Sequence, residues 1–201
     1  MSGLVAAALA AFWVVFAAEL GDKTQLFVLV LATRFPAFEV LIAITVTAAI
    51  LQGVAVGVGA VLGASLPERA VSLAAGLLFV AFGLWGLRGA IGGTSQEHEA
   101  EEEAEERSRA ATGSLIAACA AFALGELGDK TQIATVGLAT RQSALGTWIG
   151  ATLGLVAADA LAIVVGRVLG ARLPERAVRL GGAAVFVAFG VLLLVQTARV
   201  D

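Results

Sequence analysis

Long runs of apolar residues, separated by short polar breaks, follow one another along the whole chain. A membrane-spanning helix needs about 20 predominantly apolar residues. Six segments meet that requirement: residues 3–31, 39–64, 68–90, 112–139, 145–170 and 175–197. Proline stands at several of the breaks, at Pro36 after the first segment and at Pro67 and Pro174 before the third and the sixth. The pattern therefore predicts an all-α membrane protein with six transmembrane helices.

The sequence also contains an internal repeat, in which a residue corresponds without gaps to the residue 107 positions later. Glu19–Gln25 (ELGDKTQ) recurs as Glu126–Gln132, and Leu66–Val71 (LPERAV) recurs as Leu173–Val178. Each copy holds three predicted helices, and because three is an odd number the copies would cross the membrane in opposite senses. We therefore expect two inverted three-helix repeats. The predicted units are residues 1–91 (first repeat), residues 92–111 (connecting loop) and residues 112–201 (second repeat).

Composition agrees with a membrane location, because 59% of the residues are hydrophobic and only 14% are charged. The net charge of -3 comes largely from the connecting loop, which is rich in glutamate between Glu97 and Glu106. This loop is either a solvated connector or a cation-attracting tether. The charge pattern gives no support for nucleic-acid binding. Cys119 is the single cysteine, so an internal disulfide is excluded.

Arginine residues are distributed unequally between the two predicted sides of the membrane. The side of the connecting loop holds Arg34, Arg88, Arg107, Arg109, Arg167, Arg172, Arg176 and Arg179. The opposite side holds Arg69, Arg141 and Arg199. The positive-inside rule places the first group in the cytoplasm. We therefore expect the connecting loop to be cytoplasmic and both termini to lie outside.

The repeated heptapeptide places two carboxylates near the middle of an apolar span in each repeat, where a charge is costly unless it is paired or used. The glutamate, aspartate and glutamine of each motif are three residues apart, so we expect them to form a stripe of oxygen ligands on one face of a helix. The two stripes would lie at similar depth and could face one another. Gly21, Gly125 and Gly128 would allow close packing or local opening of the helix, which frees carbonyl oxygens. The candidate metal ligands are Glu19, Asp22, Gln25, Glu126, Asp129 and Gln132.

Carboxylate and amide oxygens are hard donors that suit Mn²⁺, Ca²⁺ or Mg²⁺ rather than zinc or copper. Thr24 and Thr131 either add hydroxyl oxygens or bond their own helix backbone. Lys23 and Lys130 are tuning charges or carboxylate partners, since an ammonium group cannot bind a cation. Four carboxylates and two lysines leave a formal charge of about -2, which one divalent ion or two protons would neutralise. This charge balance suggests that the site exchanges one divalent ion for two protons. The alternative is that the acids and lysines form a purely structural salt-bridge cluster.

The two repeats differ at a polar position near the middle of a predicted span. Asp159, in the fifth predicted span, corresponds to Gln52 in the second. An unpaired acid at mid-membrane depth would be expected to bind a proton rather than the metal. The alternative is a hydrogen-bonded aspartate that only packs.

With these residues in place, the sequence resembles the Gdt-type family of cation/proton exchangers. The resemblance covers the whole chain and rests on two E-x-G-D-[KR]-[ST] motifs, at Glu19–Thr24 and Glu126–Thr131. It implies exchange of Mn²⁺ and Ca²⁺ for protons, with the acids of the motifs forming the cation site. Eukaryotic members of the family are Golgi transporters, and bacterial members are similar to manganese exporters.

The function that we predict is secondary antiport, in which Mn²⁺ or Ca²⁺ leaves the cytoplasm in exchange for protons. The protein would be a transporter and not an enzyme, with no cofactor beside the transported ions, and the sequence contains no nucleotide-binding loop of an ATP-driven pump. Its partners would be divalent cations, protons and the bilayer. The short loops and the absence of an N-terminal extension indicate the plasma membrane of a prokaryote. The alternatives are a divalent-cation channel or uniporter, and a structural membrane subunit.

Overall fold

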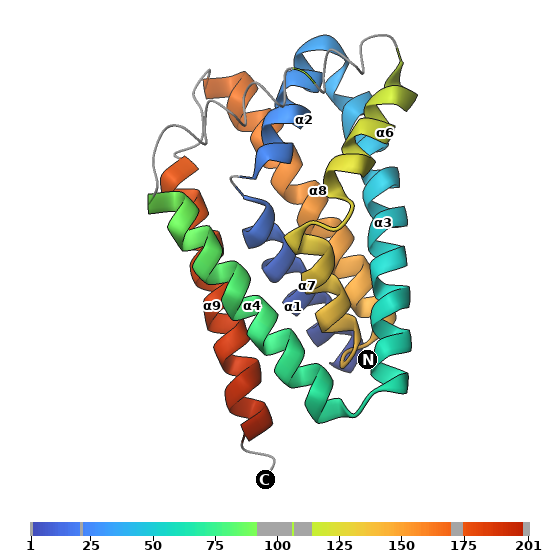
Figure 1. Cartoon of the computed structure of the whole chain (residues 1–201). Coiled ribbons are helices and arrows are strands. Elements are labelled where there is room, and N and C mark those ends of the chain that lie inside the picture. Colours follow the sequence, from blue (N-terminus) through green and yellow to red (C-terminus); the bar gives the residue numbers. More distant parts are fainter. Residues whose placement is uncertain (1, 21, 92–105, 107–113, 170–174, 199–201) are drawn as a thin grey trace.

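A computed structural model describes residues 2–20, 22–91, 106, 114–169 and 175–198, and the described part of the chain is helical (Figure 1). The connecting loop, apart from residue 106, lies outside the described residues, so the predictions made for it stay predictions. The helices are α1 (Ser2–Glu19), α2 (Lys23–Arg34), α3 (Ala37–Ser65), α4 (Glu68–Ile91), α6 (Leu115–Glu126), α7 (Lys130–Ala139), α8 (Ala144–Leu169) and α9 (Glu175–Ala198).

Five of the described helices, namely α1, α3, α4, α8 and α9, are long and apolar enough to cross a membrane. The prediction of an all-α membrane protein is therefore confirmed at this level. The first and fourth predicted spans are not continuous helices, because each is divided into two shorter helices that follow one another end to end (Figure 1). The first half of the chain thus has the helix order α1, α2, α3, α4, and the second half has the matching order α6, α7, α8, α9.

The helices of one half pack mainly against helices of the other half. α1 lies along α8, α4 lies along α9, and α3 contacts α6, α7 and α8. The common core is apolar and draws on both halves, with Val15 from α1, Phe27 from α2, Phe122 from α6 and Leu155 from α8 all at most 2% exposed. Neither half therefore has a substantial core of its own within the described residues.

The closest of these contacts joins α8 to α1 through three glycines one turn apart. A side chain at Gly146, Gly150 or Gly154 would collide with backbone atoms of Leu4, Ala8 or Phe12, respectively. Small residues at such spacing let two helix backbones touch, which is a common way to hold membrane helices together. The corresponding positions of α3 carry Ala43 and Thr47 in place of the second and third glycines, and there α3, α2 and α6 enclose a small apolar cavity.

We predict that Gly150→Leu destabilises the protein by about 1–3 kcal/mol, because the new side chain would force α1 away from α8. The measurement is the Tm of purified protein in detergent. Gly57→Leu is the matched control, since a Cβ atom at this exposed position of α3 would meet no atom of another helix within 4 Å. Equal Tm values for the two variants would contradict the described packing.

Candidate cation site

Both copies of the repeated motif interrupt their helix. α1 ends at Glu19 and α2 begins at Lys23, while α6 ends at Glu126 and α7 begins at Lys130. Tight turns close both breaks, with hydrogen bonds from the Asp22 amide to the Glu19 carbonyl (3.0 Å) and from the Asp129 amide to the Glu126 carbonyl (3.1 Å). The same backbone hydrogen bond therefore closes both breaks, between equivalent residues of the two motifs.

The expectation that each motif forms a stripe on one continuous helical face is wrong. Asp22 and Asp129 have extended backbone and stand at the N-cap positions of α2 and α7. Gly128 has φ +78°, in the left-handed region that residues with a side chain rarely adopt. The alternative of a local opening is thus confirmed at Gly128, while Gly21 lies outside the described residues.

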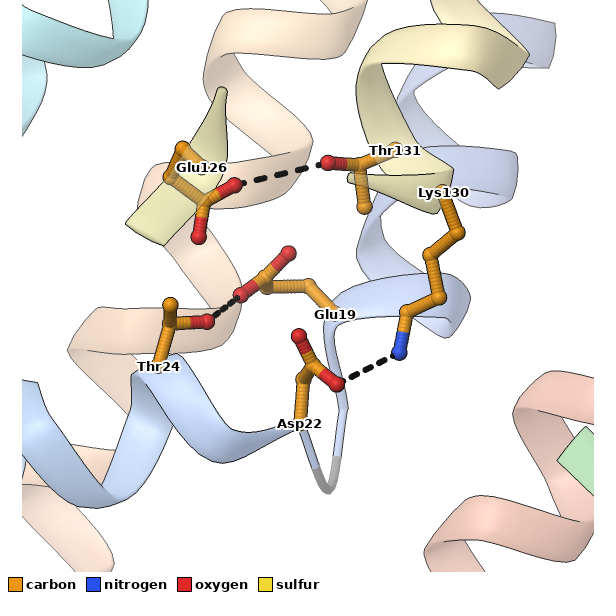
Figure 2. Close-up of polar contacts among 6 residues, drawn as sticks. All are labelled: Glu19, Asp22, Thr24, Glu126, Lys130 and Thr131. Carbon is orange, nitrogen blue, oxygen red and sulfur yellow. Dashed lines mark hydrogen bonds and ion pairs between the residues drawn. The ribbon is translucent and has the colours of Figure 1, made fainter. Parts of the chain in front are cut away.

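The acids of the two breaks converge although they are far apart in the sequence. Figure 2 shows the carboxyl groups of Glu19, Asp22 and Glu126 directed into the same region. One carboxylate oxygen from each of Glu19, Asp22 and Asp129 lies within 4.8 Å of the others. Glu19 and Glu126 are at most 1% exposed. We call Glu19, Asp22, Glu126 and Asp129 the acid cluster.

Threonine hydroxyls and one lysine supply partners to the acid cluster (Figure 2). Thr24 Oγ1 donates a hydrogen bond of 2.6 Å to Glu19 Oε1, and Thr131 Oγ1 donates a longer one of 3.5 Å to Glu126 Oε2. Lys130 Nζ forms an ion pair of 2.7 Å with Asp22 Oδ1 and so joins the two repeats. The side chain of Lys23 lies outside the described part, and its predicted role is untested.

Several oxygens of the acid cluster are buried without a hydrogen-bond donor among the described residues. They are Glu19 Oε2, Glu126 Oε1 and Asp129 Oδ2. An ionised oxygen in that position is costly, so it calls for a proton or a cation. Carboxylate oxygens from separate chain segments are also the donors that Ca²⁺, Mn²⁺ and Mg²⁺ use. The donor set therefore fits a divalent hard cation.

The two predicted glutamine ligands contact the backbone near the acid cluster. Gln25 Nε2 donates a hydrogen bond of 3.1 Å to the Ala158 carbonyl, which attaches α2 to α8. Gln132 Oε1 accepts one of 3.3 Å from the Gly128 amide and so closes its own helix break. The Gln25 contact links the two halves of the chain, and nothing in the sequence indicates it. Ligation by either amide stays a prediction.

Asp159 follows Ala158 on α8 and is fully buried. Neither of its carboxyl oxygens has a hydrogen-bond partner within the described residues, and the same is true of the amide atoms of Gln52 on α3. The carbonyl of the adjacent Ala158 accepts the hydrogen bond from Gln25, which places Asp159 next to the first motif. The mismatch between the repeats therefore identified a carboxyl group that lies near the acid cluster and has no structural partner in the described part of the protein.

Comparisons with known proteins agree with the chemistry of this site. The family model described as "Divalent cation/proton antiporter GDT1" matches residues 7–94 and residues 114–201, which correspond to the two halves of the chain. GDT1-like protein sll0615 of Synechocystis is 32% identical over 87% of this chain and 89% of its own length. GDT1-like protein 3 of Arabidopsis thaliana is 29% identical over 90% and 67%, and the chloroplastic protein PAM71 of the same plant is 31% identical over 92% and 56%. No solved structure matches the chain significantly.

Proposed function

Because the chain belongs to the GDT1 family of divalent cation/proton antiporters, we propose that it exchanges Mn²⁺ or Ca²⁺ for protons and carries the cation out of the cytoplasm. One observation carries the proposal: acids from two helix breaks meet in an apolar bundle, and three of their buried oxygens have no partner within the described residues. Such a site is suited to an ion that enters and leaves. Its hard oxygen donors favour Mn²⁺ and Ca²⁺.

In this proposal the acid cluster is the transport site, and it alternates between one bound divalent ion and two protons. The four acids and the two motif lysines together have a formal charge of about -2. One divalent ion or two protons would balance this charge, so the occupied site stays neutral inside the bilayer. Thr24 and Thr131 orient Glu19 and Glu126 through their hydrogen bonds. Gln25 and Gln132 are proposed to support the site, with ligation by their carbonyl oxygens untested.

Two further functions would use the same residues differently. A channel or uniporter would carry the cation without a counterflow of protons. In a purely structural cluster, the buried acids would be paired with one another or with lysine. The described residues contain one such pair, Lys130 with Asp22. Buried oxygens of Glu19, Glu126 and Asp129 have no hydrogen-bond partner among them. This difference supports transport over a structural role.

We predict that Glu19→Gln, Asp22→Asn, Glu126→Gln and Asp129→Asn each abolish coupled transport, because each keeps the shape of the side chain and removes a ligand charge. The assay is Mn²⁺ and Ca²⁺ uptake into proteoliposomes that contain a pH dye. Glu39→Gln, at an exposed position in the first turn of α3, is the matched control and should transport normally. Full activity in any two of the four acid variants would refute the site, and cation flux without proton movement in the unmodified protein would indicate a channel.

We also propose that α1 with α2 and α6 with α7 each form one broken span, which gives six spans in two inverted repeats. In Figure 1, α1 and α2 run away from the end of the molecule at which α1 begins, and α6 and α7 run back toward it. The first turn of α1, the α3–α4 turn and the last turn of α9 all lie toward that end. The arginine distribution then places that end outside and the connecting loop in the cytoplasm. A location in the plasma membrane of a prokaryote stays a prediction.

This orientation predicts opposite accessibility for two engineered cysteines in a Cys119→Ala background. A maleimide that cannot cross membranes should label Ala144→Cys, at the exposed start of α8, in intact cells. It should label Ser95→Cys, in the connecting loop outside the described residues, only after the cells are permeabilised. The reverse pattern would invert the proposed topology and, with it, the direction of export.

We further propose that Asp159 carries a proton during exchange and does not bind the metal. We predict that Asp159→Asn leaves equilibrium Mn²⁺ binding nearly intact and flattens the pH dependence of transport, because the variant lacks a carboxyl group that binds and releases a proton. Calorimetry and proteoliposome flux at several pH values provide the two measurements. Loss of Mn²⁺ binding would make Asp159 a ligand, and an unchanged pH profile would make it a packing residue.

A further inference from the structure

We propose that the ammonium group of Lys130 substitutes for the transported cation: it binds the acid cluster while no metal is present and withdraws from Asp22 when the metal binds. This inference rests on the proposed function and adds a positioning and affinity-setting role for one residue. It concerns the second repeat, because the structure describes the side chain of Lys130 and not that of Lys23.

The position of Lys130 carries the first step of the inference. Lys130 is the first residue of α7, and its Nζ atom reaches across to Asp22 Oδ1, at the N-cap of α2. Figure 2 shows this contact spanning the space between the two helix breaks. The ion pair therefore joins the repeats directly at the proposed transport site.

The lysine and a metal ion would also compete for the same acids. Glu19, Asp22 and Asp129 form the group whose oxygens lie close enough to share one metal ion. Asp22, one of these three, is also the carboxylate that Lys130 Nζ contacts at 2.7 Å. A divalent ion held by this group would repel an ammonium group bound to one of its ligands, and the repulsion is strong where the effective dielectric constant is low. Metal binding and the Lys130–Asp22 ion pair therefore oppose each other.

This competition has a use in transport. A site of four carboxylates would hold a divalent ion tightly and release it slowly, whereas a carrier must release its cargo on the far side. A positive group attached to the protein lowers the affinity and stabilises the acids after the ion has left. Lys130 would in this way set both the affinity for the cation and the rate of its release.

The test compares Mn²⁺ binding and transport in Lys130→Gln with the same substitution at the matched position, Lys23→Gln. We expect Lys130→Gln to bind Mn²⁺ about tenfold more tightly, because a nearby positive charge is lost. Its KM and its maximal transport rate should both fall, since release becomes slower. Lys130→Arg keeps the charge and should have the KM of the unmodified protein. The comparison with Lys23→Gln shows whether the effect is particular to Lys130. Unchanged or weaker Mn²⁺ binding in Lys130→Gln would overturn the inference.

The two proposals fail in distinguishable ways. A variant that loses a ligand, such as Glu19→Gln, should bind Mn²⁺ more weakly, which is the opposite of the effect expected for Lys130→Gln. If the acid variants transport normally, the proposed function is wrong. If the acid variants are inactive and Lys130→Gln also binds weakly, the transport site stands and Lys130 only supports its structure.

A second measurement is made on the unmodified protein, and a variant is needed only to assign the signals. Lys23 and Lys130 are the only lysines in the chain, so protein labelled with ¹⁵N at the lysine side chains gives two ammonium signals, which Lys23→Gln assigns. Saturating Ca²⁺, with binding checked by calorimetry, should make the Lys130 ammonium protons exchange faster with water, because their carboxylate partner is lost. Unchanged exchange at saturation would overturn the inference.

Discussion

The burial of several carboxyl groups between apolar helices is the constraint on which the rest of this structure depends. An ionised carboxylate in such surroundings needs a counter-charge, a proton or hydrogen-bond donors. The helix breaks bring the acids of both repeats together, Thr24 and Thr131 donate to two of them, and Lys130 neutralises a third. Under the proposed function, the transported cation and protons would supply the partners that remain.

The surrounding helices hold the two breaks in place, and α8 contacts both helices of the first break. The glycine contact between α8 and α1 fixes the helix that ends at Glu19 against the helix that carries Asp159. Gln25 attaches α2 to the same helix through the Ala158 carbonyl. α8 is therefore the common support for both sides of the first break. Under the proposed function, this support would keep the acids of that break at a fixed separation while the bound ions change.

The sequence was sufficient to predict much of the fold, because long apolar runs specify long helices. The predicted spans 39–64 and 145–170 agree closely with α3 (Ala37–Ser65) and α8 (Ala144–Leu169). The two helix breaks were not predicted, because a glycine within an apolar run is compatible with a continuous helix and with a break. The meeting of the acids followed from the repeat. The ion pair of Lys130 with Asp22 could not be predicted from the repeat, because a contact between side chains 108 residues apart depends on how the halves pack.

The interleaved packing of the two halves has a consequence for biosynthesis. Helices α1 to α4 leave the ribosome before their main packing partners, α6 to α9, have been made. Asp22 is likewise synthesised long before Lys130, its partner. The acids of the first break can therefore meet Glu126, Asp129 and Lys130 only after α6 and the start of α7 have been synthesised.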